Sequence, residues 1–201
     1  MEGSLDNPTS RFRQKCLLPA IKTSTKAGRT CSSLRVPHFS REELKEAFAT
    51  FENTVAEAAR TQDWDAWVSH YTPDVDYIEH AMGTMKGRDE VRAWITRTMS
   101  IFPGSYMTEF PSLWAVFDEE TGRVICELDN PMRDPGDGTI ISATNISIVT
   151  YAGDGLWSRQ EDIYNPLRFL KAGMKWCKKA EKLGTLDDEA AAWMRANGGL
   201  K

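Results

Sequence analysis

The chain has 201 residues, 41% of them hydrophobic and 27% charged, an ordinary composition for a single globular domain with a full core. It contains no run of 18 apolar residues that could cross a membrane. Residues 1–37 hold seven Lys or Arg and two acidic residues, a charge of +5, so the remainder, with 18 basic and 27 acidic residues, carries −9. An acidic body gives no electrostatic reason to bind nucleic acid, and we expect neither a nucleic-acid nor a membrane partner.

The four cysteines are spaced neither as a C-x-x-C pair nor with a histidine in a zinc pattern: Cys16, Cys31, Cys126 and Cys177. They are interpreted as reduced thiols, which indicates a cytoplasmic protein. The sequence also lacks a phosphate-binding loop, a nucleophile elbow and a metal motif. Any reaction is therefore expected to need no cofactor and no metal.

Residues 1–37 show no lasting hydrophobic period and are rich in Ser, Thr, Lys and Arg. We interpret them as a disordered basic tail or the product of a start codon placed too early. An organelle transit peptide and a basic arm for an acidic surface are the alternatives.

Helices are predicted on both sides of a first strand. Ser40 and Glu43 form a capping box, and apolar residues then repeat at spacings of three and four to about Arg60. Asp63 is expected to cap a second, short helix that Pro73 ends. The aromatic stripe of that helix comprises Trp64, Trp67, Val68 and Tyr71. A strand from Val75 to Ala81, a turn framed by Gly83 and Gly87, and a third helix ending at Pro103-Gly104 follow.

Long strands separated by short turns dominate the next part of the chain. They are expected at Thr108–Phe117, Val124–Met132, Thr139–Tyr151 and Leu156–Ile163. Connections this short indicate an antiparallel meander. Asn165-Pro166 opens a further helix, and Thr185 is expected to cap the last one.

The order of elements predicts an α+β fold, in which N-terminal helices wrap a cone-like, curved antiparallel sheet with a cavity at its mouth. Three regions are expected: the tail at 1–37, an α+β barrel domain at 38–165 and a C-terminal helical extension of two helices at 166–201.

The first strand carries two adjacent groups suited to proton transfer, Glu79 and His80. Alternation along a strand points them to opposite faces, so only one of them can point squarely into the cavity unless a bulge intervenes. The apolar face shared with Val75 and Tyr77 favours Glu79, whereas a pKa near neutrality favours His80. The choice stays open at this level.

Three motifs resemble the nuclear-transport-factor-2-like superfamily, and within it SnoaL-like domain proteins. They are Q-D-W at Gln62–Trp64 with Tyr71, Y-I-E-H-A-M-G-T-M-K-G-R-D-E-V-R-A-W-I at Tyr77–Ile95, and Q-E-D-I-Y-N-P at Gln160–Pro166. The resemblance covers about residues 40–165. It implies a cone-shaped barrel with a hydrophobic pocket, often dimerising through its sheet, so a homodimer is expected.

Candidate site residues follow from the strand pattern and from the resemblance to ketosteroid isomerases. Glu79 or His80 takes the place of the isomerase base. Of Glu161 and Asp162 at the end of the last strand, one must face the cavity by alternation, and a carboxylate there could pair with His80; Asp162 is the catalytic candidate. The isomerase's later acid falls near Ser147, with Asn145 on the same face, and its helix-one Tyr falls near Val55, which makes a true steroid isomerase doubtful. Candidate substrate-binding residues are Tyr77, Asn145, Ser147, Trp67, Tyr71 and Trp94.

The resulting hypothesis is a cofactor-independent isomerase, cyclase or dehydratase that acts on a small hydrophobic carbonyl or polycyclic compound. A non-catalytic ligand-binding or dimerisation module is the main alternative, and a protein-binding adaptor of the transport-factor type is a third.

Overall fold

The computed structural model describes residues 38–198. The predicted basic tail at 1–37 lies outside them. Within this range the elements are α1 (Arg41–Thr61), α2 (Asp65–Ser69), β1 (Tyr71–Glu79), β2 (Gly83–Lys86), α3 (Gly87–Met99), the 3-10 turn η1 (Gly104–Tyr106), β3 (Ser112–Asp118), β4 (Arg123–Pro131), β5 (Ser142–Gly153), β6 (Leu156–Ile163), α4 (Pro166–Leu183) and α5 (Asp188–Asn197). None of the helices in residues 38–198 is long and apolar enough to cross a bilayer.

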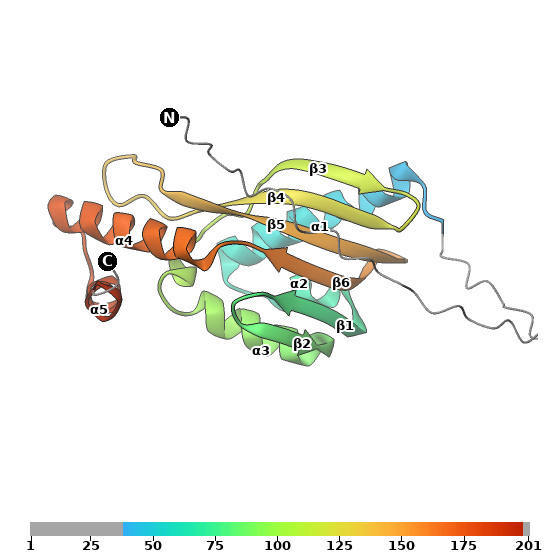
Figure 1. The fold of residues 1–201 in the computed structure, drawn as a ribbon, viewed down its shortest axis with the longest axis horizontal. Helices are drawn as coiled ribbons and strands as arrows, with labels where there is room; N and C mark the ends of the chain where they lie inside the picture. Colours follow the sequence, from blue (N-terminus) through green and yellow to red (C-terminus); the bar gives the residue numbers. More distant parts are fainter. Residues whose placement is uncertain (1–37, 199–201) are drawn as a thin grey trace, which may run out of the picture. The chain divides into compact units, whose positions relative to one another are not determined.

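The described strands form one curved sheet in the order β2-β1-β6-β5-β4-β3 (Figure 1). The predicted meander of β3, β4, β5 and β6 is confirmed, since each strand pairs antiparallel with the next. The sheet is mixed, however, because β1 pairs parallel with β6. That pairing places the first strand of the domain directly beside the last one.

Helices α1, α2 and α3 cover one face of this sheet, with α3 beside β1 and β2 (Figure 1). Phe51 of α1 packs edge-on against Tyr71, 5.8 Å between ring centroids, and Trp94 of α3 lies 4.8 Å from Tyr77. Trp157 of β6 is fully buried under Phe48 and Phe51. Large aromatic rings therefore form much of the contact between helices and sheet, and burial of such rings is a major source of stability.

Local signals define the helix ends as expected. The Ser40 hydroxyl accepts a hydrogen bond from the Glu43 backbone N–H at the start of α1, and the Asn165 side chain accepts one from Leu167 at the start of α4. Gly184 ends α4 in the left-handed conformation, at φ 72°.

Three boundary predictions were wrong. Tyr71 and Pro73 belong to β1 and not to a helix, and Pro73 is tolerated because the β1–β6 pairing shifts register between Tyr71 and Asp76. Gly83–Lys86 forms the short strand β2 and not only a turn, because it pairs with β1. Asp187 caps α5, while the Thr185 hydroxyl donates to the Pro135 carbonyl.

Candidate active site

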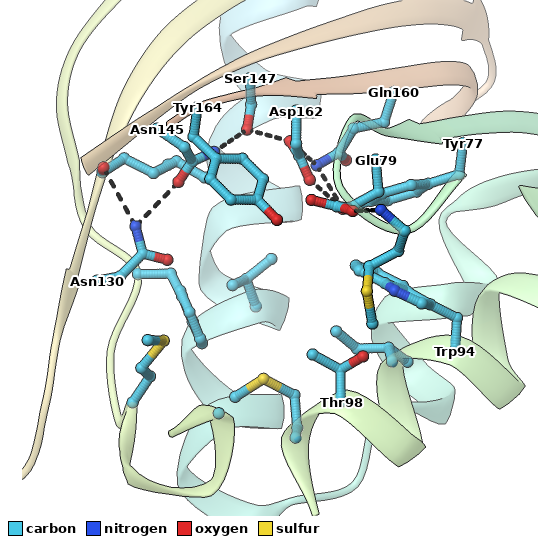
Figure 2. Close-up of a pocket in the computed structure, with 18 of the residues that line it drawn as sticks. Tyr77, Glu79, Trp94, Thr98, Asn130, Asn145, Ser147, Gln160, Asp162 and Tyr164 are labelled. Carbon is cyan, nitrogen blue, oxygen red and sulfur yellow. Dashed lines mark hydrogen bonds between the residues drawn. The ribbon is translucent and has the colours of Figure 1, made fainter. Parts of the chain in front are cut away.

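A cavity of about 530 Å³ lies between the sheet and the helices. Its volume is in the range of small-molecule sites. Most of its wall is apolar and includes Phe48, Phe51, Trp64, Trp67, Trp94, Phe102, Phe110, Phe169 and Trp193. Its polar lining includes Tyr77, Glu79, Thr98, Asn130, Asn145, Ser147, Gln160, Asp162 and Tyr164. The polar groups lie mainly on the inner face of the sheet (Figure 2).

Asp162 is a carboxylate in this lining that accepts three hydrogen bonds. Its Oδ1 accepts from the Ser147 hydroxyl at 2.5 Å and from the Gln160 amide at 3.0 Å, and its Oδ2 accepts from the Tyr77 hydroxyl. The carboxylate is thus held by three donors on β1, β5 and β6 (Figure 2). Its orientation in the cavity wall is strongly restricted.

The network continues in both directions across the sheet. Asn145 donates to the Ser147 hydroxyl at 2.9 Å, and Asn130 of β4 donates to the Asn145 carbonyl oxygen at 2.9 Å. At the other end, the fully buried Tyr71 donates to the Gln160 carbonyl oxygen at 2.5 Å. The chain of bonds satisfies polar groups that would otherwise be costly to bury.

The buried position raises the pKa of the Asp162 carboxyl, although the hydrogen bonds from Ser147, Tyr77 and Gln160 act in the opposite direction. Burial, followed by the negative charge of Asp162, also raises the pKa of Tyr77 well above its usual value. Part of the Asp162 side chain is nevertheless exposed, because it lines the cavity. A carboxyl group in this state can exchange a proton with a ligand nearer to neutral pH than an ordinary aspartate.

Glu79 faces the same cavity, and its Cα is the register partner of Asp162 on the parallel strands β1 and β6. Only 3% of the residue is exposed. Its Oε2 accepts a hydrogen bond from the Met82 backbone N–H at 2.5 Å, whereas its Oε1 is buried without a hydrogen-bond partner among the described residues. The Tyr164 hydroxyl points toward it (Figure 2), and burial, then the nearby Glu79 carboxylate, raise the pKa of Tyr164.

His80 lies on the opposite face of the strand, outside the cavity lining. Its side chain is half exposed, and its Nε2 lies 2.9 Å from Glu161 Oε1. The expected pairing of His80 with a carboxylate of the cavity is therefore wrong: strand alternation sends Glu161 outward to His80 and Asp162 inward to Tyr77 and Ser147. The choice left open between the two adjacent residues is resolved in favour of Glu79 as the cavity residue.

The structure brings most of the other candidate residues together. Tyr77, Asn145, Ser147, Trp67 and Trp94 all line the cavity. Tyr71 is outside the lining and supports Gln160 from behind.

Sequence reasoning missed the parts played by Asn130, Gln160 and Tyr164. Gln160 shares the inward face of β6 with Asp162, so strand alternation could have indicated it. No local pattern marks Asn130 or Tyr164, which reach the site through strand pairing and through the exit of the chain from β6.

The family model described as SnoaL-like domain matches residues 46–160, more than half of the chain. No curated protein matches the chain. Among solved structures, an epoxide hydrolase from M. tuberculosis, described as LEH-like, is 13% identical, with a TM-score of 0.52 over 73% of this chain and 95% of that one.

Two further structures are candidate polyketide cyclases. The one from Jannaschia sp. CCS1, described as SnoaL-like, is 16% identical, with a TM-score of 0.51 over 72% of this chain and 96% of that one. The one from Xanthomonas campestris pv. campestris is 18% identical, with a TM-score of 0.50 over 66% and 98%. At identities this low, the similarity to these solved structures shows only that the fold is shared. The family assignment depends on the match of residues 46–160 to the family model. The chain therefore belongs to the SnoaL-like domain family.

Proposed function

We propose that the cavity is the active site of a cofactor-independent enzyme that moves a proton on a small hydrophobic carbonyl compound. The observation that carries the proposal is Asp162: a carboxyl group with a raised pKa, held by three donors in the wall of an apolar cavity. Cyclase and hydrolase activities in the names of the similar structures agree with a family that performs such chemistry.

Asp162 acts as the base in this proposal. It removes a proton from the carbon next to the substrate carbonyl, and the electron pair of the C–H bond moves to form an enolate. Returning that proton to a different carbon isomerises the substrate, while attack of the enolate carbon on a second carbonyl closes a ring. Neither course requires an oxidant or a reductant.

The developing negative charge on the substrate oxygen needs hydrogen-bond donors. The Tyr164 hydroxyl points into the cavity, and one Asn145 amide hydrogen remains after its bond to Ser147. Both groups border the same space as Asp162 (Figure 2). Gln160 and Ser147 hold the base in this arrangement.

The test is hydrogen exchange on a simple ketone. The protein is incubated with β-tetralone in D₂O, and deuterium uptake at the carbons next to the carbonyl is followed by NMR. We expect wild-type protein to accelerate the exchange and Asp162→Asn to abolish the acceleration, since the amide is isosteric but cannot accept the proton. Glu161→Gln is the matched control, because Glu161 is the adjacent carboxylate on the outer face of β6.

Equal exchange rates for wild-type protein and Asp162→Asn would contradict the assignment. Binding of β-tetralone without any acceleration would instead favour the alternative, a non-catalytic ligand-binding module, which the same apolar cavity supports.

The outer face of the sheet supports a second proposal, that the protein is a homodimer. Val116, Ile125 and Ile148 form a row of register partners on that face, and Val116 is 54% exposed, with Trp114 nearby at 44%. Exposed apolar residues in such a row are typical of an interface. Val116→Lys should convert the dimer to a monomer in sedimentation analysis, and an unchanged mass would contradict this use of the face.

A cytoplasmic location also remains a proposal. Its support is that Cys126 and Cys177 are both buried free thiols.

A further inference from the structure

Part of the cavity wall is formed by residues that follow the region matched by the family. The match ends at residue 160, yet Tyr164, Pro166, Phe169 and Trp193 all line the cavity. Phe169 is on α4 and Trp193 is on α5, the two helices appended after the sheet. The part of the chain outside the family match therefore supplies part of the wall that a ligand meets.

Trp193 occupies its place because α4 has a glycine opposite it. A Cβ at Gly173 would lie 2.9 Å from Trp193 Cη2 and 3.2 Å from its Cζ3, which is closer than a side chain can approach. Glycine inside a helix is less favourable than alanine, so it needs a compensating role. Close packing of the indole ring against the helix is that role, and it brings the ring to within 4.9 Å of Phe102 between centroids.

Helix α5 is also anchored firmly to the rest of the domain. The Phe102 backbone N–H donates to Glu189 Oε1 at 2.7 Å, and Arg133 donates to Asp187 Oδ2 at 2.7 Å. The Tyr106 hydroxyl donates to the same Asp187 oxygen. These contacts join the first half of the α3–β3 connection and the β4–β5 connection to the start of α5. Trp193 is thus part of a fixed wall.

The polar cluster of the cavity is where Asp162, Glu79 and Tyr164 meet (Figure 2), and the Tyr164 ring packs on Phe169 of α4 with 4.8 Å between centroids. A ligand whose carbonyl lies at that cluster has its remaining atoms against the apolar part of the wall, to which Phe102, Phe169 and Trp193 contribute. These three side chains are rigid rings, so they limit how far a ligand can extend.

We propose that the appended helices set the size limit of the ligand: Trp193 bounds the apolar part of the cavity, so that the cavity accepts compact, ring-sized hydrophobic ketones and excludes those with a long alkyl chain. This inference rests on the proposed function for the position of the carbonyl end. It names a substrate class within that function.

The experiment uses two naphthyl ketones with the same fluorophore, prodan with a propionyl chain and laurdan with a dodecanoyl chain. Binding to the full chain is titrated by the blue shift of probe emission, with excitation of the probe itself. We expect wild-type protein to bind prodan and to discriminate against laurdan. Trp193→Ala should raise laurdan affinity relative to prodan by about tenfold or more, because each methylene that gains apolar surface strengthens binding.

Two controls keep the result interpretable. Trp114→Ala removes an exposed tryptophan from the outer sheet face and should leave the ratio of the two affinities unchanged. Trp193→Leu keeps an apolar side chain on α5 in case the alanine variant fails to fold, as judged by its melting temperature. It should shift the ratio in the same direction.

The inference is overturned if wild-type protein binds laurdan as tightly as prodan, or if a folded Trp193 variant leaves the ratio unchanged. It is also overturned if neither probe binds any variant. Failure of the proposed function appears separately, as loss of the Asp162-dependent hydrogen exchange, because the probe titration does not depend on catalysis.

Discussion

Removal of one buried hydroxyl tests whether the polar network supports the site from behind. Tyr71 is fully buried, and its hydroxyl donates to Gln160 Oε1 at 2.5 Å. In Tyr71→Phe that oxygen loses its donor on the side occupied by the fully buried Tyr71 ring, which does not line the cavity. Leaving a buried acceptor unpaired costs about 1–3 kcal/mol.

That cost translates into a measurable loss of stability without unfolding the protein. Domains are typically stable by about 5–15 kcal/mol, so the variant should remain folded. For a domain of this size, each kcal/mol lowers the melting temperature by about 2–4 °C. Urea unfolding followed by tryptophan fluorescence and circular dichroism gives the free energy, and calorimetry gives the melting temperature.

Tyr151→Phe is the matched control. The Tyr151 hydroxyl accepts a hydrogen bond from the Gly155 backbone N–H at 2.9 Å, at the β5–β6 turn where water can replace it. We expect Tyr71→Phe to be the more destabilised of the two by about 1 kcal/mol or more. The reasoning is wrong if Tyr71→Phe has the same free energy of unfolding as wild-type protein, or if it is no less stable than Tyr151→Phe.

Three other predictions concern single residues. Burial raises the pKa of Asp162 in the folded protein, so its contribution to stability is full below the pKa of the unfolded chain and declines as pH rises through the pKa of the folded protein. The melting temperature of Asp162→Asn should therefore rise relative to that of wild-type protein from about pH 4 upward. A difference that stays constant with pH would contradict this. His80→Ala should change the free energy of unfolding by less than about 1 kcal/mol, because His80 is half exposed in its pair with Glu161. The variant should also exchange ketone protons at the wild-type rate. Loss of exchange would show that His80 takes part in the reaction. Ser40→Ala should cost about 1 kcal/mol in urea unfolding by removing the cap that binds the Glu43 N–H, and Ser40→Asp, which can still cap, should not.

Local rules predicted most of the elements because their causes are local. The caps at Ser40 and Asn165 act over a few residues, and so do the turns at Asp118–Arg123, Asp134–Gly138 and Ala152–Gly155. Once those turns are placed, the antiparallel order of β3 to β6 follows from their shortness. The α+β fold could therefore be predicted from the sequence.

The errors occur where a distant partner overrides a local preference. Tyr71 is the last residue of an aromatic stripe with helical spacing, and Pro73 comes two residues later. A proline normally weakens a strand. They nevertheless join β1, because Tyr71 lies opposite Trp157 of β6 across the parallel pairing. Residues 86 positions apart in the sequence decide this strand boundary, and no short window contains both of them.

The same pairing explains why the site could be predicted only in part. Alternation along β1 established that Glu79 and His80 face opposite sides, but it could not say which side is inside, since Ile78 makes the second face apolar as well. The answer comes from β6. With Glu79 in register with Asp162, the inward carboxylate of one strand meets the inward carboxylate of the other, while His80 meets the outward Glu161.

The free energy needed to bury polar side chains on the inner face of the sheet is itself an argument for a functional site there. On β5, Asn145 and Ser147 occupy buried positions between Ala143 and Val149, where apolar residues would pack without any hydrogen-bond requirement. Each polar group there is useful to the fold only if its neighbour on the next strand is also polar, so stability alone favours an apolar row. The network instead extends from Asn130 on β4 to Tyr77 on β1, and it includes a carboxylate that faces an apolar cavity. Under the proposed function the row has a use, because Ser147, Gln160 and Tyr77 fix the orientation of Asp162. Ser147→Ala should therefore slow ketone exchange while the protein stays folded, and exchange at the wild-type rate in the folded variant would contradict this use of the row.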